Sequence, residues 1–243
     1  MTGNGYKYPQ AVLAPFEALI GFIDEHNEIL KLYASALDVT NGIGRLTEAV
    51  RKASPEAEDL PKVEDAQMFE ERCRSEVSKG HPLLVAHSAV ALWSALESTI
   101  PEFVKQFVKA NPQVLDRPQF QKLKISAAEA LKLSPEELVA FVVEELERAT
   151  QSQVKWGVGR FDELVSALGV SPVIDSTVRR DIFELSQVRN VIAHNRSVVD
   201  RKLVESCPWL DLRVGEPLRL TMADHHKYSA AVCRYAADIL EAS

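Results

Sequence analysis

The chain has 243 residues, 46% of them hydrophobic, which is enough apolar material for one large domain or two small ones. Its net charge of −7 argues against a protein that coats nucleic acid through a generally basic surface, because phosphate binding draws on lysine and arginine. We find no apolar run near the roughly 18 residues of a membrane helix and no signal peptide at the N-terminus. We therefore expect a cytoplasmic protein with no membrane contact.

The three cysteines, Cys73, Cys207 and Cys233, are odd in number and far apart in the sequence. This usage predicts reduced thiols rather than a disulfide framework or a zinc site.

The first 75 residues predict an N-terminal helical region that packs on the rest of the chain. Apolar residues recur at helical spacing across 9–37, which predicts one long helix, and the turn at 40–44 ends it. A short helical piece around 46–52 follows, then a loop of acidic and small residues, and then a strongly charged helical pattern at 62–79. We divide the chain into residues 1–75 and a helical bundle at residues 76–243.

The most apolar predicted helix runs from Leu84 to Leu96. Pro101 should break or kink it, because proline removes a backbone donor and clashes with the preceding turn. His87 and Glu97 are its notable polar residues, and either could approach a site on a neighbouring helix, although we expect packed or hydrogen-bonded helix residues. Ser134 followed by proline predicts the start of a later helix.

The C-terminal third predicts two long helices and a hairpin. Asp175 or Ser176 should cap the first helix, and Thr221 with Asp224 should cap the second, which packs on the first. Residues 212–220 alternate apolar and polar around a Gly-Glu-Pro turn, which predicts two short strands. The fold class is therefore all-α: an up-and-down helical bundle with an extra N-terminal helical region and a small β-hairpin before the last helix.

No metal or cofactor is expected. His225 and His226 are adjacent, hence about 100° apart on a helix, so they cannot jointly ligate one metal ion and should face solvent. No carboxylate cluster has metal-ligand spacing elsewhere.

One helical stretch, Leu185–Arg196, points to chemistry. The apolar stripe of this helix consists of Ile182, Leu185, Val188 and Ile192. Arg189 falls on the edge of that stripe, whereas Asn190 and His194 share a second face with Phe183. His194 should be the last helical residue with Asn195 as C-cap, where the helix dipole favours an imidazolium.

Arg189, Asn190 and His194 resemble the signature of the HEPN superfamily. That signature is an arginine, a polar residue directly after it, and a histidine separated from the arginine by four to six residues; four residues intervene here. The resemblance covers roughly residues 80–243 and leaves out the first 75. It implies a bundle of four or five helices that pairs into a dimer, with the motifs of both copies meeting at a cleft. Active members of the superfamily are ribonucleases that need no metal.

The resemblance implies a metal-independent endoribonuclease, and a toxin or phage-defence effector in particular. RNA carries its own nucleophile, the 2′-hydroxyl, so His194 could transfer the proton while Arg189 holds the phosphate. Asn190 would orient the imidazole of His194 or hydrogen-bond the phosphate. Phe183 and Gln187 would lie at the homodimer interface. The residues expected to bind RNA around the cleft are Arg179, Arg180, Arg196, Arg201 and Lys202.

Other interpretations remain open. The chain could be a HEPN-like dimer that binds RNA, a nucleotide or a protein without cutting. Arg189 could simply pair with a carboxylate while His194 caps its helix, and the cationic residues could form a solvated face with Asp181, Glu184 and Asp200. A regulatory antitoxin or defence-system protein is a further expected partner. In one such pairing a tyrosine two residues past the histidine is modified; Arg196 stands there, which argues against that regulation.

Overall fold

Helices dominate the described part of this computed structural model, which covers residues 8–40, 42–55, 61–124, 126–153 and 158–243. The α-helices are α1 (Gln10–Val39), α2 (Ile43–Ala53), α3 (Val63–Ser78), α4 (Pro82–Ala110), α5 (Pro118–Gln121), α6 (Ala127–Ala130), α7 (Pro135–Gln153), α8 (Gly159–Ala167), α9 (Ser176–His194), α10 (Arg201–Ser206) and α11 (Met222–Ala242). Two short 3-10 helices are η1 (Pro112–Asp116) and η2 (Pro208–Leu210). The predicted all-α class is confirmed.

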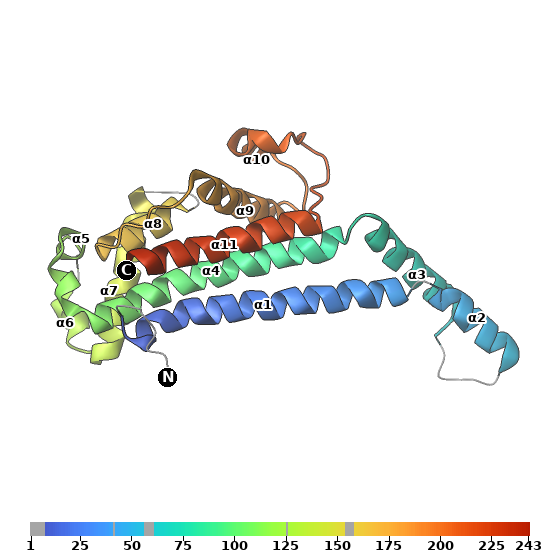
Figure 1. Cartoon of the computed structure of the whole chain (residues 1–243), viewed down its shortest axis with the longest axis horizontal. Coiled ribbons are helices and arrows are strands. Elements are labelled where there is room, and N and C mark those ends of the chain that lie inside the picture. The colour runs from blue at the N-terminus through green and yellow to red at the C-terminus, as the bar shows by residue number, and fades with distance from the viewer. Residues whose placement is uncertain (1–7, 41, 56–60, 125, 154–157) are drawn as a thin grey trace.

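The long helices lie side by side (Figure 1). α4 is central: α1, α9 and α11 all pack on it, and α9 also packs on α11, as predicted for the closing helix. α4 runs antiparallel to α1 and to α9. The fully buried side chains at these contacts include Phe16, Leu92, Leu96, Ile100, Phe103, Ile182, Leu185, Tyr228 and Tyr235.

The N-terminal residues divide into two parts. α1 shares the core of the bundle, where the rings of Phe16 and Phe103 lie 4.9 Å apart between centroids. α2 and α3 pair with each other and extend away from the bundle as an arm (Figure 1). Their close approach depends on Gly44, whose N–H donates to Glu70 Oε2 over 2.9 Å and where a Cβ would meet Gln67 at 2.9 Å.

The sequence predicts a break or a kink at Pro101; α4 continues through it, so a break does not occur. Phe103, Val104 and Phe107 beyond the proline are buried, as are Leu96 and Ile100 before it. Burial of each such side chain stabilises the helix by about 1.5–3 kcal/mol, which together outweighs the roughly 3 kcal/mol cost of an interior proline.

By length and composition alone, α4 is long and apolar enough to cross a membrane. An 18-residue window within it reaches a mean hydropathy of 1.4, so our expectation that no segment approaches this length is wrong. Core helices of soluble proteins pass the same test, and α4 packs against α1, α7, α8, α9 and α11.

The predicted hairpin at residues 212–220 does not form, and the described residues contain no strand. The segment pairs instead with residues just after α9, through an antiparallel bridge between Val198 and Pro217. Gly215 donates to the Val199 carbonyl over 2.8 Å, at a φ of +90° that favours glycine. Residues 195–221 therefore form a loop whose two ends are hydrogen-bonded to each other and which projects from the bundle (Figure 1). We call this segment the α10 lobe.

The predicted helix starts are confirmed. Asp175 accepts a hydrogen bond from the backbone of Thr177 and caps α9. Thr221 and Asp224 form a complete capping box at α11. At α7, the Ser134 backbone donates to the Glu137 carboxylate over 2.8 Å.

Candidate functional site

The buried face of α9 follows the predicted stripe. Ile182, Leu185 and Val188 are no more than 1% exposed, while Ile192 is only partly buried. The Arg189 side chain lies at the edge, 25% exposed. The interpretation of Arg189 as an edge residue is confirmed.

The Arg189 guanidinium contacts two other polar side chains. Nη2 lies 3.6 Å from Glu97 Oε2 of α4, and Nη1 donates to Asn190 Oδ1 over 3.2 Å. Nε is buried and makes no hydrogen bond to any described residue. This N–H, one of the five guanidinium donors, is therefore unsatisfied by the described residues, and an unsatisfied buried donor lowers the stability of a protein.

A second arginine shares the same carboxylate. Arg160 of α8 donates to Glu97 Oε1, and its guanidinium lies 4.8 Å from the Phe161 ring centroid and 5.8 Å from that of Trp93. Its Nε, like that of Arg189, has no described partner. We call Arg160, Glu97 and Arg189 the Arg–Glu–Arg cluster.

Sequence reasoning named Glu97 as a residue that could approach the motif helix but gave Arg160 no role. Arg160 lies on another helix, so no spacing within the sequence connects it to Arg189. Two guanidinium groups around one carboxylate leave an excess of positive charge. Glu147 lies nearby: burial raises the pKa of its carboxyl, and the positive charge of Arg160 lowers it.

His194 stands apart from this cluster. It is the exposed last residue of α9, followed by Asn195 at the C-cap position, as predicted. Among the described residues no hydrogen bond or ion pair joins it to Arg189, and the two are about 140° apart around the helix. Within one chain, the arginine and histidine of the motif face different directions.

The residues predicted to bind RNA fall into two groups. Arg179 is ion-paired with Asp162 of α8, and Arg180 contacts Asp181 over 3.3 Å. The others, Arg196, Arg201 and Lys202, are exposed on the α10 lobe. The lobe therefore carries more of this predicted surface than α9 does.

The predicted dimer face needs one correction. Phe183 is partly buried against the core. Gln187 is only 3% exposed and donates to Ser186 Oγ over 3.0 Å, so its side chain offers no open surface to a second copy. Spacing along one helix does not show which segments from elsewhere in the chain pack against each of its sides.

The expectation that His225 faces solvent is also wrong, whereas His226 is exposed as expected. His225 is 1% exposed; its Nε2 is hydrogen-bonded to Asn27 of α1 and its Nδ1 to Ser88 of α4, both over 2.6 Å. Ser88 also bonds His26 Nε2 over 2.9 Å. Burial is the main cause that lowers the pKa of His225 to about 4, so this chain of groups holds neutral imidazoles at pH 7.

Glu184 is a buried carboxylate that sequence reasoning assigned to a solvated face. It is 1% exposed and accepts three hydrogen bonds, from Trp209 Nε1 (2.6 Å), the Tyr228 hydroxyl (2.7 Å) and Lys227 Nζ (2.5 Å). Burial, reinforced by this negative charge, raises the pKa of the neighbouring Cys207 thiol to about 12. Glu184 thereby joins α9, η2 and α11.

In the described residues no group of three or more His, Cys, Asp or Glu could hold a metal ion.

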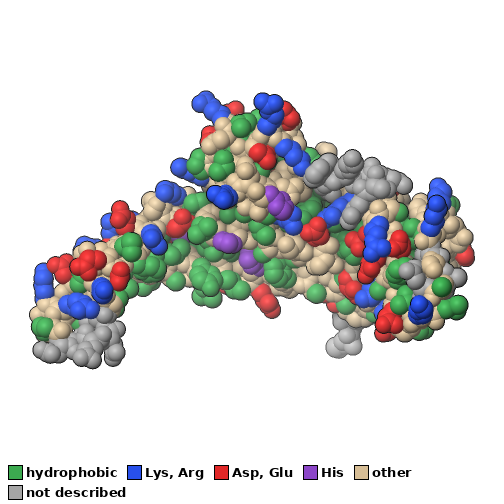
Figure 2. Space-filling view, turned by 180° about the vertical axis from the view of Figure 1, so that it is seen from behind, with side chains coloured by type: hydrophobic (Ala, Val, Ile, Leu, Met, Phe, Trp, Pro, Cys, Tyr) green, Lys and Arg blue, Asp and Glu red, His purple; other side chains and the backbone are tan. Residues whose placement is uncertain are grey.

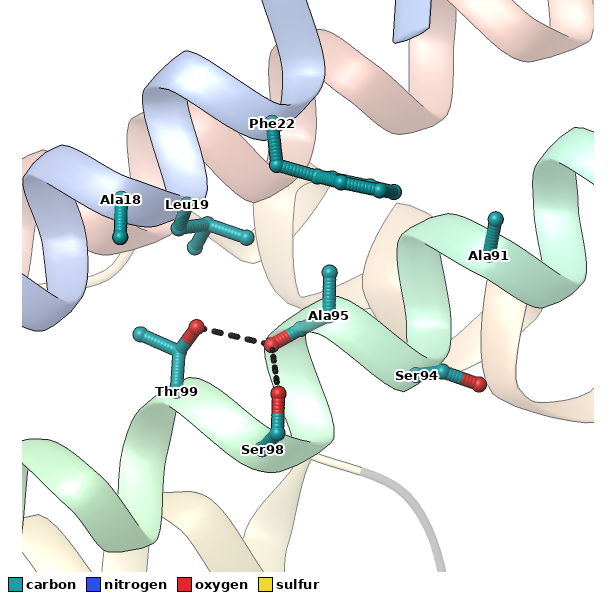
Figure 3. A pocket seen from close by; sticks show the side chains of 8 residues that line it. All are labelled: Ala18, Leu19, Phe22, Ala91, Ser94, Ala95, Ser98 and Thr99. Carbon is teal, nitrogen blue, oxygen red and sulfur yellow. Dashed lines mark hydrogen bonds between the residues drawn. The ribbon is translucent and has the colours of Figure 1, made fainter.

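A pocket of about 480 Å³ lies between α1 and α4 (Figure 3). Its lining consists of Ala18, Leu19, Phe22, Ala91, Ser94, Ala95, Ser98 and Thr99. The Ser98 and Thr99 hydroxyls both donate to the Ala95 carbonyl, so the helix backbone already binds them. The pocket contains no residue of the motif and offers little polar chemistry.

The candidate site therefore consists of the Arg–Glu–Arg cluster with Asn190, and of the exposed His194 at the end of the same helix. The comparisons of the chain with protein-family models, with curated proteins and with solved structures returned no match. What the site does is accordingly argued from these residues.

Proposed function

We propose that the chain is a metal-independent endoribonuclease of the HEPN type, a toxin or phage-defence effector, whose active site forms between two copies. Arg189 and Asn190 of one copy and His194 of the other act on one phosphate. The observation that carries this proposal is the Arg189 guanidinium: Glu97 and Asn190 orient it, while its Nε remains without a described partner. The reaction class comes from the resemblance in the motif.

The proposed reaction is a transesterification within the RNA. His194 takes the proton of a 2′-hydroxyl, and that oxygen attacks the adjacent phosphorus. The bond from phosphorus to the 5′-oxygen breaks, and the imidazolium returns a proton to the leaving oxygen. The products are a 2′,3′-cyclic phosphate and a 5′-hydroxyl, with no external co-reactant.

The Arg–Glu–Arg cluster suits the charge that develops on the phosphorane. Its two guanidinium groups exceed its one closely paired carboxylate in charge, and a fork of N–H donors matches two phosphate oxygens. Because the donors are oriented before the substrate binds, little reorganisation is needed during the reaction.

Two copies are required because the motif residues diverge. Arg189 lies at the core edge beside α4 and α8, whereas His194 is exposed on another side of α9. A two-fold axis near the C-terminal end of α9 would bring Arg189 of one copy to His194 of the other.

The test is cleavage of labelled single-stranded RNA in EDTA. Arg189→Ala and His194→Ala should each lower the rate about 10²- to 10⁴-fold, because they remove charge stabilisation and proton transfer. His226→Ala, at an exposed histidine outside the site, is the matched control and should cleave normally. Circular dichroism should show all three variants folded.

A mixture of Arg189→Ala and His194→Ala chains sharpens the test. Each mixed dimer contains one complete pairing of Arg189 with His194, so the mixture should recover part of the activity that each variant lacks alone. Loss of cleavage in EDTA with recovery on Mg²⁺, or folded variants that cut at the wild-type rate, would refute the proposal. A HEPN-like dimer that binds RNA without cutting would then replace it.

A further inference from the structure

The α10 lobe gathers exposed cationic side chains. It projects from the bundle directly after α9, and Lys and Arg side chains gather on and around it (Figures 1 and 2). The exposed basic residues of the lobe are Arg196, Arg201, Lys202, Arg213 and Arg219. The lobe also carries four carboxylates, Asp200, Glu205, Asp211 and Glu216. Its five basic and four acidic residues leave a net charge of +1, so the lobe is slightly basic on a chain with a net charge of −7.

The lobe also carries an exposed aromatic side chain in a fixed position. Trp209 of η2 is 43% exposed, yet its indole N–H donates to the buried carboxylate of Glu184 over 2.6 Å. Because Lys227 and Tyr228 hold the same carboxylate, the anchor of the ring is itself rigid. The Arg180 guanidinium lies 6.0 Å from the ring centroid.

The contacts of the ring on α9 lie ten to fourteen residues before the proposed catalytic histidine. Arg180, which contacts Trp209, lies fourteen residues before His194 and therefore on nearly the same side of α9. Glu184, which anchors Trp209, precedes His194 by ten residues, or about 15 Å along the helix axis. A short single-stranded segment of RNA could reach both.

We infer that Trp209 is a stacking platform for a base of single-stranded RNA, and that Arg180, Arg196, Arg201 and Lys202 bind the flanking phosphates. This inference rests on the proposed function for its substrate class. A rigid aromatic ring beside cations is the combination that binds unpaired bases together with their backbone. The bases of a duplex are already stacked and paired, so they cannot use the ring.

The test compares Trp209→Phe with Trp209→Leu, both in a His194→Ala background that cannot cut. Both changes remove the N–H that Glu184 accepts, so their structural damage should match; they differ in whether an aromatic face remains. Fluorescence anisotropy with a labelled single strand should show that Leu weakens binding about 5- to 150-fold relative to Phe. Val214→Ala, at another exposed apolar residue of the lobe, is the control and should bind normally.

A duplex of the same sequence should bind the Phe and Leu variants equally. The inference is overturned if the two variants bind the single strand equally at matched melting temperatures, in which case the lobe serves a protein partner. If the two variants bind the single strand equally and the wild-type chain cuts RNA, the inference about Trp209 is refuted and the nuclease proposal stands. A wild-type chain that does not cut, but whose Phe and Leu variants differ in binding, would sink the nuclease proposal alone.

Discussion

Two carboxylates around α9 have opposite surroundings. Glu184 has a side chain 2% exposed and accepts from three donors, Trp209, Lys227 and Tyr228. Glu97 has a side chain 35% exposed and lies between two arginines, each of which keeps a buried Nε without a described partner.

The difference separates two uses of buried polar groups. A fully bonded cluster such as that of Glu184 holds helices in one arrangement, because any loss leaves several groups unpaired. A cluster with unused donors costs stability in the free protein, and a bound oxyanion could accept hydrogen bonds from those donors once they are exposed to it. We therefore expect changes at Glu184 to affect folding and changes at Glu97 to affect function.

The largest expected effect is that of Glu184→Ala. It leaves the Tyr228 hydroxyl and the Trp209 N–H without their acceptor and leaves Lys227 only its pair with Asp224 over 3.6 Å. The free energy of unfolding should therefore fall by about 3–5 kcal/mol. Urea unfolding measures it. Glu205→Ala, at an exposed carboxylate of the α10 lobe, is the control and should stay within about 0.5 kcal/mol of wild type. A small loss at Glu184 would break the comparison.

The second effect is a pH dependence set by His225. Burial, with smaller effects from His26 and His226, lowers the pKa of His225 to about 4. The unfolded chain therefore takes up this proton near pH 6.5, before the folded chain does, so the stabilisation is present above pH 6.5. The free energy of unfolding should fall by roughly 3 kcal/mol between pH 6.5 and 4.

Urea unfolding across pH 4 to 7.5 tests this slope. His225→Gln should flatten it, whereas His226→Gln, at the exposed neighbour, should leave it in place. A slope that survives in the His225 variant would assign the acid sensitivity to other groups.

A third effect isolates one donor of the Glu184 cluster. Tyr228→Phe removes the hydroxyl that donates to Glu184 but keeps the buried ring, so it should lower the free energy of unfolding by about 1–3 kcal/mol. In a background of Glu184→Ala the same change should cost less, because its acceptor is already gone. Additive losses in the double variant would show that the two groups do not act as one cluster.

The smallest expected effect on stability is that of Glu97→Gln. Glu97 pairs with Arg189 over 3.6 Å and with Arg160 at closer range, and both ion pairs are partly exposed. The free energy of unfolding should therefore change by less than about 1 kcal/mol. In contrast, kcat for RNA cleavage should fall while KM changes little, because an amide orients the guanidinium less firmly. Steady-state kinetics and urea unfolding together decide it, and a stability loss as large as that of Glu184→Ala would contradict our reading of the cluster.

Much of the fold follows from local pattern. The starts of α7, α9 and α11 could be predicted because each depends on residues within one turn of the helix start, such as Thr221 and Asp224. The end of α9 at His194 and the edge position of Arg189 also followed from spacing along one helix. The prediction of a hairpin at 212–220 was wrong because this segment pairs with Val198, after α9, and its two halves do not pair with each other.

The chain's own sequence determined its helical class, the capping of its main helices and the register of the motif on α9, since these depend on neighbours a few residues away. Tertiary structure alone decided that Arg160 joins Arg189 at Glu97, that Glu184 lies buried among three donors, and that His225 is enclosed by α1 and α4. Each of these contacts brings together helices far apart in the chain. The burial and pairing of a charged side chain depend on which helix packs over it, and periodicity along one helix does not contain that information.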